Sequence, residues 1–294
     1  MLDFKPLTLS IRDEYLSCFY AAEERASDYS FINLWAWNDE RRYEIAFHED
    51  LCWTRLVASE PFEMWAPIGN WSGKNWKIIL GKLFPEGVTF CRVTEKLTQL
   101  LQEKLGDMIE IKEERSEWEY IYSAKELINL SGNRFHSKKN LLSQFLKHNP
   151  VYEEINSDNI MDIITLQSER KPEDQDRLPE VLDENSAVKR VLSNWGKMPG
   201  IMGGILRIDG KLVAYTIAED IGGGSVIIHF EKGFYLDSYK GVYQGINQIF
   251  LKNTGEKFSL VNREQDMGLL GLRQAKMTYN PLGFIRKYSV KWKG

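Results

Sequence analysis

The stretch GGILRIDGKLVAYTIAED, residues 203–220, is followed closely by the stretch SVIIHFEKG, residues 225–233. In the first stretch, two apolar runs flank Asp209-Gly210, and an Asp-Gly pair between such runs is the strongest short-range signal of a β-hairpin. The second stretch is a short run of apolar and β-branched residues, which is typical of a strand. The sequence therefore predicts a hairpin followed at once by a third strand.

The segments around these strands predict further helices and strands in a fixed order. In the second half, we expect helices at 159–170, 184–196, 239–255 and 268–279, and strands at 258–264 and 282–292. In the first half, we expect helices at 11–24, 31–38, 75–84 and 94–106, a hairpin at 43–58, strands at 62–69 and 88–93, and extended structure at 108–123. Both halves therefore share one element order, which predicts two tandem α/β domains, residues 1–122 and residues 123–294.

This order resembles the acyltransferase fold typified by Gcn5-related N-acetyltransferases. The resemblance implies that each domain is a mixed, mostly antiparallel sheet flanked by helices. In that fold the fourth and fifth strands splay apart, and backbone amides with a helix N-terminus receive the acyl donor there. We expect the active cleft in the second domain.

Composition and charge limit the classes of function. The 294 residues carry a net charge of −4, so the chain as a whole has no basic footprint for nucleic acid. Residues 1–120 hold 14 Lys and Arg against 22 Asp and Glu, whereas residues 121–294 hold 24 against 20. Three scattered cysteines, no apolar run near the ~18 residues of a membrane span, and no signal-peptide pattern predict a cytoplasmic protein.

His229 and Glu231 are the first candidate catalytic residues. They lie two apart in the expected strand, so both side chains belong on one face. Glu231 is suited to act as a general base on an amine or to bind its ammonium group, and His229 is suited to the same work. The pair makes a poor metal site, and we predict none. The alternative is a structural ion pair with Lys or Arg.

The junction between the halves predicts an anion site. No Asp or Glu occurs from Leu127 to Tyr152. A helix N-terminus combined with cations binds phosphate well. The candidate phosphate-binding residues here are Arg134, His136, Lys138 and Lys139. The alternative is a solvated basic helix that joins two domains.

The loop before the expected helix 239–255 is the place where an acetyltransferase would bind the pyrophosphate of coenzyme A. If Gly241 is the first glycine of that loop, Tyr243 stands where glycine or alanine is usual, and its ring would crowd the pyrophosphate. We list Gly241 and Tyr243 as donor-binding candidates, but this departure argues against plain acetyl-CoA chemistry.

The stretch NREQDMGLLGLRQAKMTYNP, residues 262–281, predicts a strand end, a turn and a helix with a polar face. We expect Arg273 and Lys276 to hold phosphate and Tyr279 to protonate a leaving group. Arg263, Glu264 and Asp266 precede the helix and are the candidates for binding the acceptor. The alternative is a structural salt-bridge network.

Four motifs, SDYSFINLWAW, LSGNRFHSKKN, IHFEKG and the stretch 262–281, together resemble proteins related to the C-terminal domain of phosphatidylglycerol lysyltransferase. That family is similar to the Fem aminoacyltransferases, which consist of two tandem acetyltransferase-like domains. The resemblance implies transfer of an aminoacyl or acyl group to an amine or hydroxyl. It implies aminoacyl-tRNA as donor, with the tRNA acceptor end on the basic junction.

The resemblance leaves several alternatives open. An acyl-CoA donor would make the chain an N-acetyltransferase, and loss of the chemistry would leave a binding protein with the same fold. The lysyltransferases carry a long membrane region that this chain does not show, which argues against a lipid acceptor. We expect a small-molecule or lipid-headgroup acceptor, and its identity stays open. We predict no covalently bound cofactor, and the sequence does not indicate an oligomeric state.

Overall fold

The computed structural model describes residues 2–170 and 178–294. Contacts within the chain separate it into two compact units. Unit 1 comprises residues 1–119 and 285–294, and unit 2 comprises residues 120–284. The last ten residues, which we expected in the second domain, thus belong to the first unit.

Unit 1 contains an eight-stranded mixed sheet in the order β1-β2-β3-β4-β6-β15-β7, with β5 paired to β3. Its strands are β1 (Lys5–Pro6), β2 (Tyr43–His48), β3 (Leu51–Leu56), β4 (Glu63–Trp65), β5 (Ile68–Gly69), β6 (Val88–Thr94), β7 (Ile109–Glu113) and β15 (Lys287–Trp292). Its helices are α1 (Arg12–Ala21), α2 (Phe31–Ala36), α3 (Asn38–Arg41), α4 (Trp76–Leu83) and α5 (Glu95–Leu105). β15 lies between β6 and β7 and is antiparallel to both, so the end of the chain completes this sheet.

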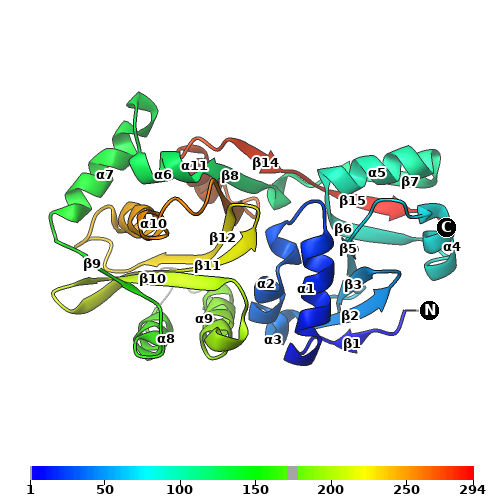
Figure 1. The fold of residues 1–294 in the computed structure, drawn as a ribbon, viewed down its shortest axis with the longest axis horizontal. Coiled ribbons are helices and arrows are strands. Elements are labelled where there is room, and N and C mark those ends of the chain that lie inside the picture. Colours follow the sequence, from blue (N-terminus) through cyan, green and yellow to red (C-terminus); the bar gives the residue numbers. More distant parts are fainter. Residues whose placement is uncertain (1, 171–177) are drawn as a thin grey trace. The chain divides into compact units, whose positions relative to one another are not determined.

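Unit 2 contains a seven-stranded sheet in the order β14-β8-β13-β12-β11-β10-β9. Its strands are β8 (Glu119–Ser123), β9 (Val151–Glu154), β10 (Ile201–Ile208), β11 (Lys211–Gly222), β12 (Ser225–Gly233), β13 (Leu260–Gln265) and β14 (Gly283–Ile285). Its helices are α6 (Ala124–Asn129), α7 (His136–Leu146), α8 (Ile160–Ser168), α9 (Leu178–Leu192), α10 (Val242–Asn253) and α11 (Leu270–Met277). In Figure 1, α6, α7 and α10 cover one face of this sheet, and α8 and α9 cover the other.

The expected hairpins and the mixed α/β class are confirmed. β10 and β11 join at Asp209-Gly210, where both residues adopt the positive φ that such a turn requires. The segment 62–69 forms two short strands instead of one, and 282–292 divides into β14 and β15, which belong to different sheets. Alternation predicts extended structure, but it does not specify the sheet that a strand joins.

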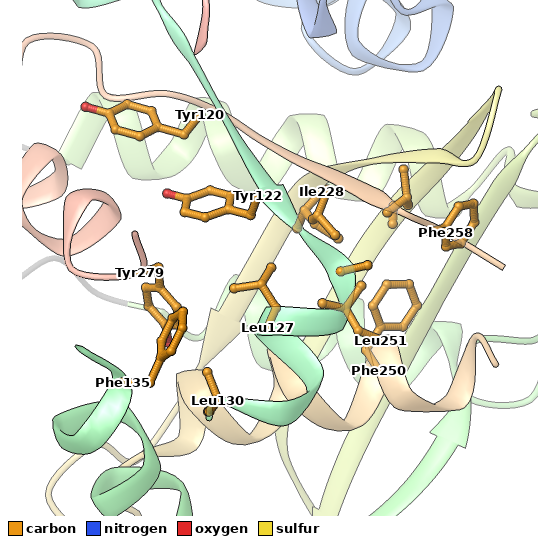
Figure 2. Close-up of a cluster of buried hydrophobic side chains, with 14 of the residues drawn as sticks. Tyr120, Tyr122, Leu127, Leu130, Phe135, Ile228, Phe250, Leu251, Phe258 and Tyr279 are labelled. Carbon is orange, nitrogen blue, oxygen red and sulfur yellow. The ribbon is translucent and has the colours of Figure 1, made fainter. Parts of the chain in front are cut away.

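The core of unit 2 lies between β8, β12, β13 and the helices α6, α7 and α10. Figure 2 shows Leu127 of α6, Leu130 just after α6, Phe250 and Leu251 of α10, and Ile228 of β12 in this cluster. Two tyrosines of this cluster, Tyr120 and Tyr122, project side by side from β8 (Figure 2). The same cluster includes Val261 of β13 and Tyr279, which follows α11.

Candidate active site

The two parallel strands β12 and β13 separate part-way along their length. They pair only from Ser225 to Ile227, which lie opposite Leu260 to Asn262, although β12 continues to Gly233. Beyond that point the strands are linked by side chains instead of backbone hydrogen bonds. This is the splay that the resemblance to the acetyltransferase fold implies, and charged residues of both strands lie beside it.

His229 is the extra residue of a β-bulge. Ile228 pairs with Ala218 and Phe230 pairs with Ile217, so His229 has no partner on β11. Bulges redirect side chains, and the simple two-residue alternation that we expected for His229 and Glu231 therefore does not hold through this region.

The ring of His229 is clamped between two carboxylates. Its Nδ1 lies 2.9 Å from Glu264 Oε1 and its Nε2 lies 3.0 Å from Glu219 Oε2, while the side chain is only 1% exposed. Burial lowers the pKa of His229, but the two hydrogen-bonded glutamates outweigh it and raise the pKa from 6.5 to about 9. Both ring nitrogens then donate at neutral pH, so His229 is a positioning residue and has no lone pair with which to act as a base.

The clamp predicts a pH-dependent stability. Because the folded pKa of His229 is raised, its contribution is fully present below pH 6.5 and is lost as the pH rises through about 9. A shift of this size corresponds to roughly 3 kcal/mol of unfolding free energy at most. Urea unfolding at pH 6 and pH 9.5 should show a deficit for His229→Gln at the lower pH that shrinks at the higher pH. The exposed His136→Gln is the control, and an equal deficit at both pH values would contradict the clamp.

Glu231 lies further along β12 and is held by β13 and α10. Its Oε1 accepts from Arg263 Nη2 at 2.6 Å, and its Oε2 accepts from Asn247 Nδ2 at 2.8 Å. Burial lowers the pKa of Arg263, but Glu231 and the phenols of Tyr279 and Tyr122 raise it above its ordinary value. Glu231 therefore sits beside a permanent cation. A carboxylate has about four acceptor positions, so it can still bind an ammonium group.

Tyr279 occupies the centre of the site. Its hydroxyl oxygen accepts a hydrogen bond from Gln244 Nε2 at 3.1 Å, and its ring is 4.8 Å from the Arg263 guanidinium carbon. On the ring, the Lys138 ammonium lies 4.5 Å from the centroid. Burial, followed by the charge of Arg263, lowers the pKa of Lys138. Within the part of the chain that the structure describes, no carboxylate pairs with Lys138, whereas Arg263 is paired with Glu231, so Lys138 is the cation with charge to offer an anion.

Asp266 organises the turn between β13 and α11. The carboxylate is fully buried and accepts from Tyr120 at 2.6 Å, from the Gly268 amide at 2.9 Å and from Arg273 at 2.8 and 3.0 Å. Burial favours the neutral acid, but the bonds from Arg273, Tyr120 and Gly268 hold the pKa of Asp266 well below its ordinary value. The geometry gives Asp266 and Arg273 a structural task in place of the ligand-binding ones that the sequence suggested.

Lys276 has a similar structural task. Its ammonium donates to the carbonyl oxygens of Arg263, Glu264 and Gln265, the last at 2.7 Å. Tyr122 donates to the Lys276 carbonyl at 2.9 Å. One lysine thus fixes three successive carbonyls where β13 ends, including that of Glu264, which has a positive φ of 56°. The expected ion-paired network is present, and it aims Arg263 and Glu264 into the splay.

The remaining candidates lie in or just before α7 and at the start of α10. Arg134 pairs with Glu126 of α6, and His136 and Lys139 are exposed, so Lys138 is the member of this group that reaches Tyr279. A Cβ on Gly241 would lie 2.1 Å from the Leu141 carbonyl oxygen.

Gly241 and Gly245 allow α7 to pack directly against α10. A Cβ on Gly245 would lie 2.2 Å from the ring of Phe145. Two glycines four residues apart let helices approach closely, and here they bring the backbone of α7 over the loop that we listed for phosphate. Burial raises the pKa of Tyr243, which hydrogen-bonds the backbone of Gly233 at the end of β12.

Comparison with known proteins identifies the family. The family model described as phosphatidylglycerol lysyltransferase, C-terminal, matches residues 20–291. The chain belongs to this family. No curated protein matches the sequence.

Solved structures share the fold over almost the whole chain. A conserved protein of unknown function from Bacteroides thetaiotaomicron VPI-5482 is 29% identical over 100% of both chains, with a TM-score of 0.90. L-PGS from Bacillus licheniformis is 12% identical over 96% of this chain and 92% of its own, with a TM-score of 0.63. FemX is 8% identical over 98% of this chain and 97% of its own, with a TM-score of 0.60. The expected resemblance to lysyltransferase C-terminal domains and to Fem-type proteins is therefore confirmed.

For this member of the lysyltransferase C-terminal family, three site residues were not among our candidates. Gln244 and Asn247 project from α10 to Tyr279 and Glu231, and Glu219 holds His229 from β11. The signal for the first two is their spacing of three in α10, which places both on one face. The signal for Glu219 is an acid directly after residues 212–218 of β11, a run in which Thr216 is the one polar residue. Among residues 2–170 and 178–294, no helix has the length and apolarity to cross a membrane.

Proposed function

We propose that this protein is an aminoacyltransferase that moves an aminoacyl group from aminoacyl-tRNA to a hydroxyl or amine acceptor. Its membership of the lysyltransferase C-terminal family over residues 20–291 supports the reaction class. The arrangement of Tyr279, Glu231 and Lys138 around the splay supports the site. Unit 2 supplies all of these side chains.

In the proposed reaction, an acceptor oxygen or nitrogen attacks the aminoacyl carbonyl. The ester bond to the terminal ribose of the tRNA breaks, and a new ester or amide bond forms. The acceptor loses one proton and the departing ribose oxygen gains one to become a hydroxyl, so atoms and charges balance. Positioning of the two substrates contributes most of the acceleration.

Tyr279 is placed to move that proton. Its oxygen already accepts from Gln244, which leaves the phenolic O–H to donate to the departing oxygen. Arg263 and Lys138 lie on the ring and stabilise negative charge that develops on it. Glu231 binds the ammonium group of the aminoacyl donor with the acceptor positions that its ion pair with Arg263 leaves open.

The contact between Gly241 and Leu141 favours tRNA over coenzyme A as the donor. In acetyltransferases the pyrophosphate of coenzyme A binds at the amides of this loop and helix N-terminus. Here the carbonyl oxygen of Leu141 lies against the α-carbon of Gly241. A carbonyl oxygen at that place both fills the space and repels an anion. The single observation that favours one donor over the other is therefore the close packing of α7 on the start of α10, where the Leu141 carbonyl oxygen contacts Gly241.

We expect aminoacyl-tRNA, but not acetyl-CoA, to raise the melting temperature of the protein. A ligand at one hundred times its Kd adds about 2.7 kcal/mol, which corresponds to a shift of about 5 °C for a chain of this size. Lys138→Ala should reduce the shift, and the exposed Lys125→Ala on α6 should leave it unchanged. A shift with acetyl-CoA alone would instead support an N-acetyltransferase, and the absence of any shift would favour a binding protein.

A further inference from the structure

Three aromatic rings lie in a row on the surface where β12 leads into α10. Tyr235 and Tyr239 of the connecting loop 234–241 are perpendicular to each other, with 6.4 Å between their ring centroids. The ring of Tyr239 lies 5.2 Å from that of His148, which follows α7. Tyr235 is 38% exposed and His148 is exposed, whereas Tyr239 packs against an apolar cluster of α10 and the sheet. We call these three rings the aromatic row.

Lysines surround the aromatic row. The Lys211 ammonium, at the turn between β10 and β11, lies 3.4 Å from the ring centroid of Tyr235. Lys147 and Lys240, at the end of α7 and in the loop, are exposed. The three segments that form this surface contain five lysines and two aspartates: 136–150, 209–211 and 234–241. The surface is therefore cationic, although the whole chain has a net charge of −4.

Two helices connect the aromatic row with the candidate active site. Lys138, near the start of α7, lies on the ring of Tyr279, and His148 follows the end of the same helix. At a rise of 1.5 Å per residue, about 15 Å separates Lys138 from His148. Gln244, in the first turn of α10, hydrogen-bonds Tyr279, and the loop 234–241 leads directly into that turn. A polymer that leaves the reactive phenol along α7 therefore reaches the aromatic row.

We propose that the aromatic row binds the unpaired 3′ end of the donor RNA, with bases stacked on its rings and phosphates beside its lysines. Every base has a π-face, so exposed aromatic rings next to cations bind single-stranded RNA with little dependence on sequence. The bases of a duplex stack on one another and do not offer their faces. The combination of rings and ammonium groups, at the end of the path from Tyr279, selects an unpaired strand as the occupant.

The inference rests on the proposed function, because it takes the donor to be tRNA, and it adds the place where the end of that tRNA is held. An aminoacyl ester at Tyr279 is attached to the last nucleotide of the unpaired end, so the preceding nucleotides must leave the site over the neighbouring surface. Tyr235 then binds the donor away from the reacting atoms. Its loss should raise the KM for charged tRNA and leave kcat nearly unchanged.

The experiment compares two labelled, uncharged RNA hairpins that differ only in an unpaired CCA end. Binding to the purified protein is followed by fluorescence anisotropy at fixed low salt, so no transfer is required. The hairpin with the unpaired end should bind about fivefold or more tightly than the blunt one, because each stacked base contributes to affinity. Tyr235→Ala should remove most of this difference, and Tyr235→Phe, which keeps the ring, should preserve it.

Tyr20→Ala is the matched control. Tyr20 is 40% exposed, and the Arg25 guanidinium carbon lies 5.3 Å from its ring centroid, so its exposure and its neighbouring cation resemble those of Tyr235. It lies in unit 1, within the acid-rich residues 1–120. This variant should bind both hairpins as the wild type does, and its melting temperature and that of Tyr235→Ala, measured without RNA, show whether each is folded.

Three results would overturn the proposal. The first is equal binding of the two hairpins to the wild type, and the second is an unchanged difference between them in a folded Tyr235→Ala. The third is loss of the difference in Tyr235→Phe as well, because recognition would then depend on the hydroxyl and not on the ring. Equal hairpin binding together with a concentration-dependent dimer that Leu236→Gln dissolves would assign this surface to a second copy of the chain.

The two proposals fail in different ways. If stacking is wrong and the transferase is right, Tyr235→Ala transfers aminoacyl groups with the KM and kcat of the wild type. If the transferase is wrong and stacking is right, the wild type keeps its preference for the unpaired end and no aminoacyl group leaves charged tRNA.

Discussion

Lys287→Met should lower the free energy of unfolding of unit 1 by about 3 to 5 kcal/mol, because it takes the lysine cation from buried Glu119 and leaves buried Asp28 with Arg92. The Lys287 ammonium is fully buried and pairs with Asp28 and Glu119, which are themselves buried. Burial lowers the pKa of Lys287, but Asp28 and then Glu119 raise it above its ordinary value. The charged state is therefore the one that the fold requires.

The rest of this cluster is already engaged and cannot replace the lysine. Arg92 pairs with Asp28 at 2.9 Å and with Glu117 at 2.5 Å. Ser27 donates to Glu119 through both its backbone amide and its hydroxyl. Because Lys287 belongs to the C-terminal strand, the substitution should also loosen β15 from β6 and β7.

Tryptophan fluorescence is a suitable measurement, because eight of the nine tryptophans lie in unit 1 and only Trp195 lies in unit 2. The fluorescence-detected midpoint in urea should fall for Lys287→Met. Lys291→Met is the matched control, since it makes the same change at an exposed position of the same strand. Equal midpoints for the two variants would mean that the buried cluster contributes no net stability.

Lys287 also illustrates the limit of sequence reasoning about the fold. The hairpins at Glu49-Asp50 and Asp209-Gly210 follow from local turn chemistry and alternation, and both were predicted. The position of β15 in the sheet is set by its pairing with β6, whose residues lie nearly 200 positions earlier in the chain. Local patterns contain no information about such a pairing.

In the candidate site, too, the sequence indicates which residue types are involved but not which partner each one binds. The charged residues in 262–281 correctly indicated a network, because a solvated helix does not need such a set. Whether Arg273 binds phosphate or Asp266 depends on the turn that brings the two within 3 Å of each other, and only the folded backbone defines that turn. The bulge at His229 is likewise invisible in the sequence, because a single extra residue leaves the apolar pattern almost unchanged.

Tyr279→Phe should lower the rate of aminoacyl transfer by roughly 10²- to 10⁴-fold, which is the usual contribution of a positioned acid or base. The substitution removes only the hydroxyl that Gln244 orients. The ring and the cations that lie on it remain, so the KM for charged tRNA should change little. The assay follows a labelled aminoacyl group from tRNA to phosphatidylglycerol in mixed micelles, with a panel of amino acids.

Tyr122→Phe provides the matched control for this change. Tyr122 lies in the same buried cluster, and its ring is perpendicular to that of Tyr279 at 6.5 Å between centroids. Its hydroxyl donates to the Lys276 carbonyl, so the phenol is a structural donor. Losing this bond should cost about 1 kcal/mol of stability and only a few-fold in rate. Similar rates for the two variants would exclude Tyr279 as the proton donor. A large loss confined to Tyr279→Phe, with the KM preserved, would locate the proton transfer at this phenol, since a purely structural role would affect both tyrosines.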